Sequence, residues 1–328
     1  MTLRVSVVVP TFKRPDLLEK CLTALLAQDF APTDYEIIIV DDAACDETRQ
    51  QVECRAKHVE CCGHTIRYIP VMDIRSPRGP AIARNRGWRA ARSEIIAFTD
   101  DDCIPERNWL KAGVAVLAGG TIGASGRIIV PLSHTPTDYE YNASHLEQSE
   151  FATANCFYRR CALILVGGFD ERFTAPWRED SDLFFTLLNR NCIFTSVPEA
   201  VVIHPVRSAR WGISLHQQRK SMFNALLYKK HPVLYKQKLQ ATPPWHYYGI
   251  VGALLVMLVG ILKRSRPVAF AGLCGWLYLT ARFCIQRLRQ TSRSPLHIVE
   301  MIVTSILIPP LAIFWRLRGA IKFRMFFL

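Results

Sequence analysis

The stretch Glu94-Ile95-Ile96-Ala97-Phe98-Thr99-Asp100-Asp101-Asp102 says more about fold and chemistry than any other segment of the chain. Its mostly apolar first half predicts a buried strand, and three carboxylates follow where that strand ends. Carboxylates held close together repel one another, and a divalent cation with oxygen ligands is the usual remedy. In open α/β sheets, ligands bind at the carboxyl ends of strands. The alternative is a solvated acidic turn in which one aspartate caps a helix.

A second acidic strand end lies nearer the start of the chain. Residues 6–10 (SVVVP) and 36–40 (EIIIV) predict two strands, and Asp41 and Asp42 follow the second one. Between these strands, residues 14–26 have apolar positions at helical spacing. A strand, a helix and a strand in this order predict a βαβ unit and therefore a parallel sheet.

A basic helix start is expected to meet the same edge of the sheet. A third strand is predicted over residues 65–70, and a helix over 81–91 opens with the sequence ARNRG, which contains Arg84 and Asn85. Two acidic strand ends and this helix start should converge, because the carboxyl ends of parallel strands share one edge. That edge could hold a nucleoside diphosphate and its metal.

Six motifs carry a resemblance to a known family. They are VVVPT at 7–11, VDD at 40–42, ARNRG at 83–87, FTDDD at 98–102, GGFDERF at 167–173 and REDSDL at 178–183. In this order they resemble the family 2 glycosyltransferases, inverting enzymes of the GT-A fold that use nucleotide sugars. The resemblance covers about residues 1–230 and implies an α/β fold, Rossmann-like, with a mainly parallel central sheet flanked by helices.

The resemblance implies roles for individual residues, which we treat as expectations. Asp180 would be the catalytic base that takes the proton of the acceptor hydroxyl, although a carboxylate in a first helical turn can also serve only as a cap. Asp100 and Asp102 match an Asp-x-Asp metal motif for Mg²⁺ or Mn²⁺, and His204 would be a further metal contact. Ten residues are expected to bind substrate: Thr11, Asp41, Asp42, Arg84, Asn85, Asp101, Asn155, Gly168, Asp170 and Glu179.

Composition limits the classes of partner. The 328 residues have a formal net charge of +13, yet no nucleic-acid motif is present, and the basic residues bracket apolar segments, which favours a membrane surface. No signal peptide is expected, because Met1 lies just before the first core strand. No Gly-x-Gly-x-x-Gly follows that strand, which excludes a dinucleotide oxidoreductase.

The eleven cysteines are scattered and several lie in apolar runs, which is typical of a reducing compartment. One cluster contains Cys54, His58, Cys61, Cys62 and His64. It lacks the paired Cys-x-x-Cys spacing of a structural zinc site, so ordinary thiols are favoured over zinc, and the sequence leaves both open.

We expect a glycosyltransferase domain over residues 1–232, with a nucleotide-binding half at 1–105 and an acceptor half at 106–232. A membrane-associated helical tail should follow at 233–328, with hydrophobic segments at about 245–262, 267–285 and 296–315. The third segment is doubtful because the pair Pro309-Pro310 should break its helix. Basic residues flank every segment, so the charge distribution does not settle the topology.

The resemblance, together with the apolar tail, implies a metal-dependent, inverting enzyme that adds one sugar from a UDP-sugar to a hydroxyl of a lipid-linked or polysaccharide acceptor. The Gln-x-x-Arg-Trp motif of processive members is missing around Arg210-Trp211, which favours single additions. The catalytic domain is expected on the cytoplasmic face of the inner membrane. The alternatives are a polyprenyl-phosphate glycosyl synthase and an inactive membrane-bound scaffold of a glycan-assembly complex.

Overall fold

The structure is a computed structural model, and it describes residues 3–72, 79–117 and 119–327. By internal contacts the chain divides into two compact units. Unit 1 comprises residues 1–131 and 144–206, and unit 2 comprises residues 132–143 and 207–328. Residues 207–232, expected to belong to the acceptor half, therefore group with the tail, as does the segment 132–143.

Unit 1 is built on one mixed sheet. Its strands are β1 (Val5–Thr11), β2 (Tyr35–Asp41), β3 (Thr65–Pro70), β4 (Ile95–Phe98), β5 (Ile104–Pro105), β6 (Gly123–Ile129), β7 (Cys156–Arg159) and β8 (Phe194–Ile203). The order across the sheet is β3-β2-β1-β4-β7-β6-β8-β5. The first four strands are parallel, β7 is antiparallel to both neighbours, and β6 and β8 are parallel. The predicted α/β fold with a mainly parallel sheet is confirmed.

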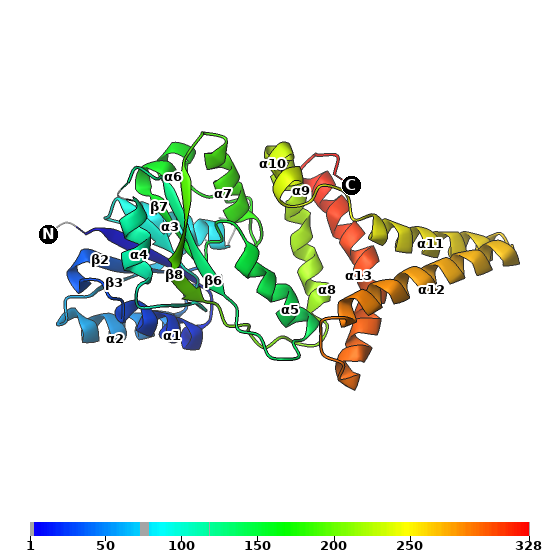
Figure 1. Cartoon of the computed structure of the whole chain (residues 1–328), viewed down its shortest axis with the longest axis horizontal. Coiled ribbons are helices and arrows are strands. Elements are labelled where there is room, and N and C mark those ends of the chain that lie inside the picture. Colours follow the sequence, from blue (N-terminus) through cyan, green and yellow to red (C-terminus); the bar gives the residue numbers. More distant parts are fainter. Residues whose placement is uncertain (1–2, 73–78, 118, 328) are drawn as a thin grey trace. The chain divides into compact units, whose positions relative to one another are not determined.

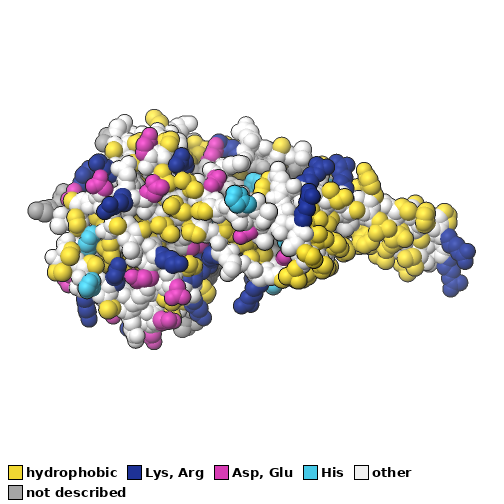
Figure 2. All heavy atoms as spheres, turned by 60° about the horizontal axis from the view of Figure 1, so that its bottom comes forward, with side chains coloured by type: hydrophobic (Ala, Val, Ile, Leu, Met, Phe, Trp, Pro, Cys, Tyr) yellow, Lys and Arg dark blue, Asp and Glu magenta, His cyan; other side chains and the backbone are white. Residues whose placement is uncertain are grey.

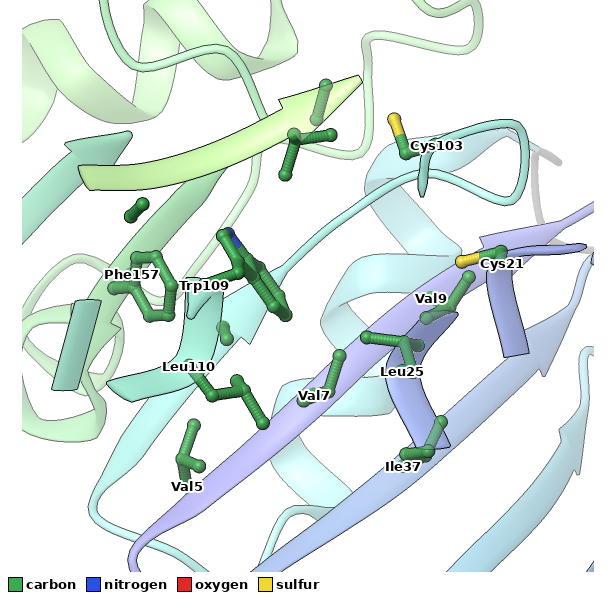
Figure 3. Close-up of a cluster of buried hydrophobic side chains, with 14 of the residues drawn as sticks. Val5, Val7, Val9, Cys21, Leu25, Ile37, Cys103, Trp109, Leu110 and Phe157 are labelled. Atoms are coloured by element: carbon green, nitrogen blue, oxygen red, sulfur yellow. The ribbon is translucent and has the colours of Figure 1, made fainter. Parts of the chain in front are cut away.

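Helices cover both faces of this sheet. Those of unit 1 are α1 (Pro15–Leu26), α2 (Asp46–Glu60), α3 (Pro80–Ala90), α4 (Trp109–Leu117), α6 (Arg160–Val166) and α7 (Glu179–Leu188), with short 3₁₀ turns at Pro32–Asp34 and His145–Gln148. Figure 3 shows one apolar layer, in which Val5, Val7 and Val9 of β1 lie with Leu25 of α1 and Trp109 of α4. Alternate residues of β1 therefore point to one face, as the two-residue period of a strand requires.

The opposite face of the sheet carries α3. At Gly87 of this helix, an added Cβ atom would come within 2.3 Å of Val8 Cγ1 and 3.1 Å of Val40 Cγ2. Only a residue without a side chain lets α3 lie this close to β1 and β2. Aromatic rings continue the same layer, since Phe98 makes edge-to-face contacts with Phe169 at 5.3 Å.

Unit 2 is helical. It contains α5 (Asp138–Ser144) except for its last residue, followed by α8 (Ile213–Gln217), a 3₁₀ turn η3 (Gln218–Met222), α9 (Phe223–Lys230), α10 (Pro232–Lys238), α11 (Trp245–Leu262), α12 (Arg266–Leu288) and α13 (Pro295–Lys322). Among the described residues, α11, α12 and α13 are long and apolar enough to cross a membrane. The helices α11 and α12 form a hairpin (Figure 1).

The α11–α12 hairpin has an apolar surface and a basic turn. Figure 2 shows hydrophobic side chains over this arm and Lys and Arg side chains at its tip, where the sequence is Lys263-Arg264-Ser265-Arg266. The two helices pack closely at glycines, since an added Cβ on Gly260 would lie 2.3 Å from the Ala269 nitrogen. Small residues at such a contact are typical of helix pairs in membranes.

Two expectations for unit 2 are corrected. Pro309 and Pro310 do not break the third segment, because α13 runs without interruption from Pro295 to Lys322. Many turns on either side, packed against α8, η3, α9 and α12, hold the helix through the pair, although each proline removes one backbone hydrogen bond. The Lys- and Arg-rich sequence of residues 212–231 predicts one amphipathic helix, but the segment is divided, since η3 separates α8 from α9.

Asn155 holds three parts of unit 1 together, and its substitution should destabilise the fold. Its fully buried amide accepts from Trp109 Nε1 at 2.8 Å and donates to the carbonyl oxygens of Arg127 and Ala200 at 2.9 and 2.8 Å. Asn155→Ala would leave these groups unpaired and should cost about 3 kcal/mol. Thermal unfolding of the detergent-purified chain should show a clearly lower Tm. Gln50→Ala, on the exposed side of α2, is the control, and equal Tm values for both variants would contradict this role.

Candidate functional site

The centre of the candidate site is Arg84 on α3, which is 3% exposed. Its Nη2 donates to Asp100 Oδ1 at 2.7 Å, and its Nη1 donates to Glu179 Oε1 at 2.9 Å. One guanidinium therefore joins the acidic end of β4 to the first turn of α7. Burial alone would lower the pKa of Arg84, but the two carboxylates together raise it above its ordinary value.

Glu179 is the more buried of the two carboxylates. Burial raises its pKa to about 7, although Arg84 acts in the opposite direction. Its second oxygen, Oε2, is buried and has no hydrogen-bond partner among the described residues. Asp180, the expected base, follows directly and is only half-buried, and its Oδ1 accepts from the Ser181 backbone at 2.6 Å. The carboxylate of Asp180 is thus more accessible than that of Glu179.

The three aspartates after β4 have different partners. Asp101 points back toward β1, where its Oδ2 accepts from Thr11 Oγ1 at 2.8 Å and its Oδ1 lies 3.2 Å from Arg14 Nη1. Burial raises the pKa of Asp101 to about 6, and Arg14 lowers it in part. Thr11 and Asp101 therefore bind each other in this structure, and their contact with substrate stays a prediction.

Asp102 lies in a group of potential metal ligands. Ligand atoms of Asp102, Cys103 and His204 all lie within 4.8 Å of one another, and Asp102 Oδ1 is 3.5 Å from His204 Nε2. Burial and the neighbouring Asp100 and Asp102 raise the pKa of the Cys103 thiol well above its usual value, so the sulfur is protonated as long as no cation is bound. The carboxylate and the imidazole remain as an oxygen and a nitrogen donor, which suits Mn²⁺ or Mg²⁺ better than a soft metal.

At the end of β2, the side chain of Asp41 accepts several hydrogen bonds from the protein. Asp41 is fully buried, and its carboxylate accepts from the backbone of Ala43 and Cys45 and from the Tyr68 hydroxyl, all within 2.9 Å. Asp42 is also buried. These bonds fix the turn after β2, and substrate binding by Asp41 and Asp42 stays a prediction.

Asn85 ties α3 to the turn at 167–173. Its Nδ2 donates to the Phe169 carbonyl at 2.8 Å and to Glu171 Oε1 at 2.9 Å, and its Oδ1 accepts from the Phe169 backbone. Gly168 has a φ of +83°, and an added Cβ would lie 2.4 Å from Asn85 Oδ1. This close approach and the positive φ explain why a glycine occupies position 168. Asp170 forms an ion pair with Arg172 at 2.6 Å.

The structure therefore brings together part of the predicted set. Arg84 connects Asp100 to Glu179, and His204 meets Asp102, although these five residues come from four separate segments. Asn155 and Asn85 have their amides occupied by protein groups. The sequence reading missed Arg14, Tyr68 and Cys103, and only Cys103 had a signal, since it directly follows the aspartate triplet.

The cysteine cluster lies elsewhere. Exposed Cys54 and His58 are on α2, and Cys61 Sγ is 3.8 Å from Cys62 Sγ in the turn that follows. Within the described ranges, the group of Asp102, Cys103 and His204 is the one that meets the geometry of a metal site.

Comparisons with known proteins agree on the class of enzyme. The family model described as "Glycosyl transferase family 2" matches residues 6–173, about half of the chain. The validoxylamine A glucosyltransferase of Streptomyces hygroscopicus subsp. limoneus is 25% identical over 292 residues, covering 75% of this chain and 61% of that enzyme. The GalNAc(5)-diNAcBac-PP-undecaprenol beta-1,3-glucosyltransferase of Campylobacter jejuni is 36% identical over 99 residues, covering 30% of this chain and 29% of that enzyme.

A solved structure supports the fold. The mannosyltransferase PcManGT from Pyrobaculum calidifontis, in complex with GDP-Man and Mn²⁺, matches 99% of this chain and 88% of its own with a TM-score of 0.56. The sequences are 18% identical, so this likeness concerns the fold. The predicted GT-A fold and the predicted class of enzyme are confirmed.

The effects of losing Arg84 and of losing Glu179 on stability should not be additive. Arg84→Gln removes the cation that lowers the pKa of Glu179, so this buried carboxylate must either take up a proton or stay charged without a partner, and the change should cost about 3–5 kcal/mol. The double variant Arg84→Gln/Glu179→Gln should be less destabilised than the sum of the single variants, because it leaves no buried charge at Glu179. Thermal unfolding of the four proteins measures this coupling, and strictly additive changes would argue against the ion pair.

The raised pKa of Glu179 predicts a pH dependence of stability. As the pH rises from about 4.5 to 7, the unfolded chain releases the proton of Glu179 before the folded chain does, so the wild type loses stability. The shift corresponds to about 3 kcal/mol. Glu179→Gln should lack this loss, so its Tm relative to wild type should increase between pH 5 and pH 8. A Tm difference independent of pH would show that Glu179 titrates normally.

Proposed function

The chain belongs to glycosyl transferase family 2, and we propose that it moves one sugar from a nucleotide-diphosphate sugar to an acceptor hydroxyl with inversion at the anomeric carbon. The observation that carries this proposal is the contact of Arg84 with both Asp100 and Glu179. Through it, the acidic strand end that would face the leaving diphosphate adjoins the helix start that carries Asp180. Inverting transfer needs both groups, one on each side of the reacting carbon.

The residues present fit a divalent cation. Asp102 and His204 would hold Mg²⁺ or Mn²⁺, with Asp100 nearby on the same loop. When bound, the ion would neutralise the charge of the diphosphate. The structure of PcManGT contains Mn²⁺ and GDP-Man, which supports metal use by an enzyme of this fold.

Side chains of the protein would accept the proton, position the helices and bind the nucleoside. Asp180, half-buried and following Glu179, would accept the acceptor proton. Arg84 would act as a positioning residue that fixes α7 relative to the end of β4, because both of its terminal nitrogens are bound to carboxylates. Thr11, Asp41 and Asp42 lie at the ends of β1 and β2, where the nucleoside of a UDP-sugar would bind.

The acceptor is proposed to be a lipid-linked glycan or a polysaccharide at the membrane. Three apolar helices in the described residues could anchor the chain, and the C. jejuni relative is named for an undecaprenol-linked substrate. We propose the inner membrane, with the catalytic domain on the cytoplasmic face, where nucleotide sugars are made.

Hydrolysis of the donor tests the proposal without knowledge of the acceptor. The purified chain should hydrolyse at least one sugar in a panel of UDP-, GDP- and dTDP-sugars with Mn²⁺, and EDTA should abolish this. Asp102→Ala should lose Mn²⁺ binding, measured by electron paramagnetic resonance, and reduce hydrolysis by about 100-fold. Asp29→Ala, an exposed carboxylate with 70% of its side chain accessible, is the matched control. Hydrolysis that survives EDTA or Asp102→Ala would contradict the metal role.

A second measurement separates the proposal from a polyprenyl-phosphate synthase. A phosphate acceptor is already ionised, so it needs no base, whereas a hydroxyl acceptor does. Asp180→Asn should therefore reduce transfer by about 100-fold or more while leaving Mn²⁺-dependent nucleotide binding intact. Nearly unchanged transfer would favour the synthase, and a chain that binds no nucleotide would favour the scaffold.

A further inference from the structure

Unit 2 contains a cavity of about 250 Å³ that the proposed chemistry does not use. Its walls come from three segments of this one unit: the start of α5, the loop and helix at 207–214, and the first two turns of α13. Its volume is below the range typical of sites for drug-sized ligands and suits a small polar group.

The acidic side chains that line this cavity already accept hydrogen bonds from other groups of the unit. Three carboxylates line it, and each already has a partner. Asp138 accepts from Arg287 through both oxygens, at 3.2 and 2.7 Å. Glu300 Oε1 accepts from the Gly212 backbone at 2.7 Å. Glu140 Oε2 accepts from the backbone and the hydroxyl of Thr137, at 2.6 and 3.0 Å.

Two donor groups of the lining have no hydrogen-bond partner among the described residues. Arg210 is exposed, and no hydrogen bond or ion pair of its guanidinium is found within the described residues. The hydroxyl of Ser214 is buried and lacks a hydrogen-bond partner in the same part of the chain. A guanidinium fork and an unbonded hydroxyl suit an anionic oxygen ligand, and the fork matches phosphate geometry in particular.

The charge of the whole unit agrees with this. Unit 2 has 19 Lys and Arg residues against 3 Asp and Glu residues, a formal charge of +16, and its three acids are the three that line the cavity. Arg287 neutralises Asp138, whereas Glu140 and Glu300 are bonded to neutral groups and keep their charge. Attraction of an anion therefore comes from the excess of cations in the unit as a whole.

The position of the cavity suggests where the anion comes from. His297 and Glu300 belong to the first turns of α13, and the helix beyond them is apolar and long enough to cross a membrane. Basic pockets at the ends of such helices bind lipid head groups. We propose that this cavity binds the phosphate or diphosphate of a membrane lipid, with Arg210 and Ser214 as its donors. This inference rests on the proposed function in one respect: the lipid that the cavity binds would be the lipid part of the proposed acceptor.

The test measures binding to the full chain in detergent, with EDTA present and no donor. Isothermal titration is made with farnesyl diphosphate, inorganic pyrophosphate and farnesol. Farnesyl diphosphate should bind at least tenfold more tightly than either of the others. Arg210→Gln should weaken its binding about tenfold, as expected for loss of a charge-assisted hydrogen bond. Ser214→Ala should weaken it with no loss of Tm, because the hydroxyl has no protein partner.

Arg264→Gln, in the exposed turn between α11 and α12, removes the same charge outside the cavity and should leave binding unchanged. Equal binding of farnesol and farnesyl diphosphate would overturn the proposal, and so would an Arg210→Gln variant that binds like the wild type. Equal binding of pyrophosphate and farnesyl diphosphate would show that the cavity binds a free anion and would contradict a lipid as its ligand. Failure of donor hydrolysis leaves these results untouched, because neither metal nor donor is present in this assay.

Discussion

One buried cation determines the arrangement of the catalytic unit. Arg84 is almost inaccessible to water, so its charge must be compensated by protein groups, and Asp100 and Glu179 provide that compensation. The position of Arg84 depends in turn on Gly87, one turn further along α3, because any side chain there would collide with Val8. The close packing of α3 therefore places the buried arginine, and the buried arginine requires the two carboxylates from distant segments.

The three adjacent aspartates after β4 each contact a different partner. Asp100 is held by Arg84, Asp101 by Thr11 and Arg14, and Asp102 lies beside His204. Each carboxylate thus has a partner of its own, although Asp100 and Asp102 still repel the charge of Asp101 and help burial to raise its pKa. A cation would find an oxygen donor in Asp102 with a nitrogen donor next to it, while Asp101, whose pKa burial raises, serves the contact between β1 and the loop after β4.

Local patterns were enough to predict the strands and the edge where they end, because apolar β-branched runs and acidic ends are properties of short segments. The partners of individual side chains could not be predicted in this way. The family resemblance implies substrate binding by Asn155, yet its amide is bonded to Trp109 and to two carbonyl groups from other strands. Likewise, the Pro309-Pro310 pair predicts a broken helix, but packing along α13 outweighs the local cost. Contacts between distant segments decide both cases.

Charge is distributed very unequally between the two units. The tail unit has a formal charge of +16, whereas the whole chain has +13, so the catalytic unit is slightly acidic. The three acids of the tail unit are all bonded to groups of that unit, and Asp138 and Arg287 are both about nine-tenths buried. Removing a partner from the Asp138–Arg287 pair would leave an unpaired buried charge, so Asp138 is a fixed structural element. The unit's cations are not neutralised by acids elsewhere in it, and this excess is the physical reason to expect an anionic ligand at a helix end that adjoins apolar surface.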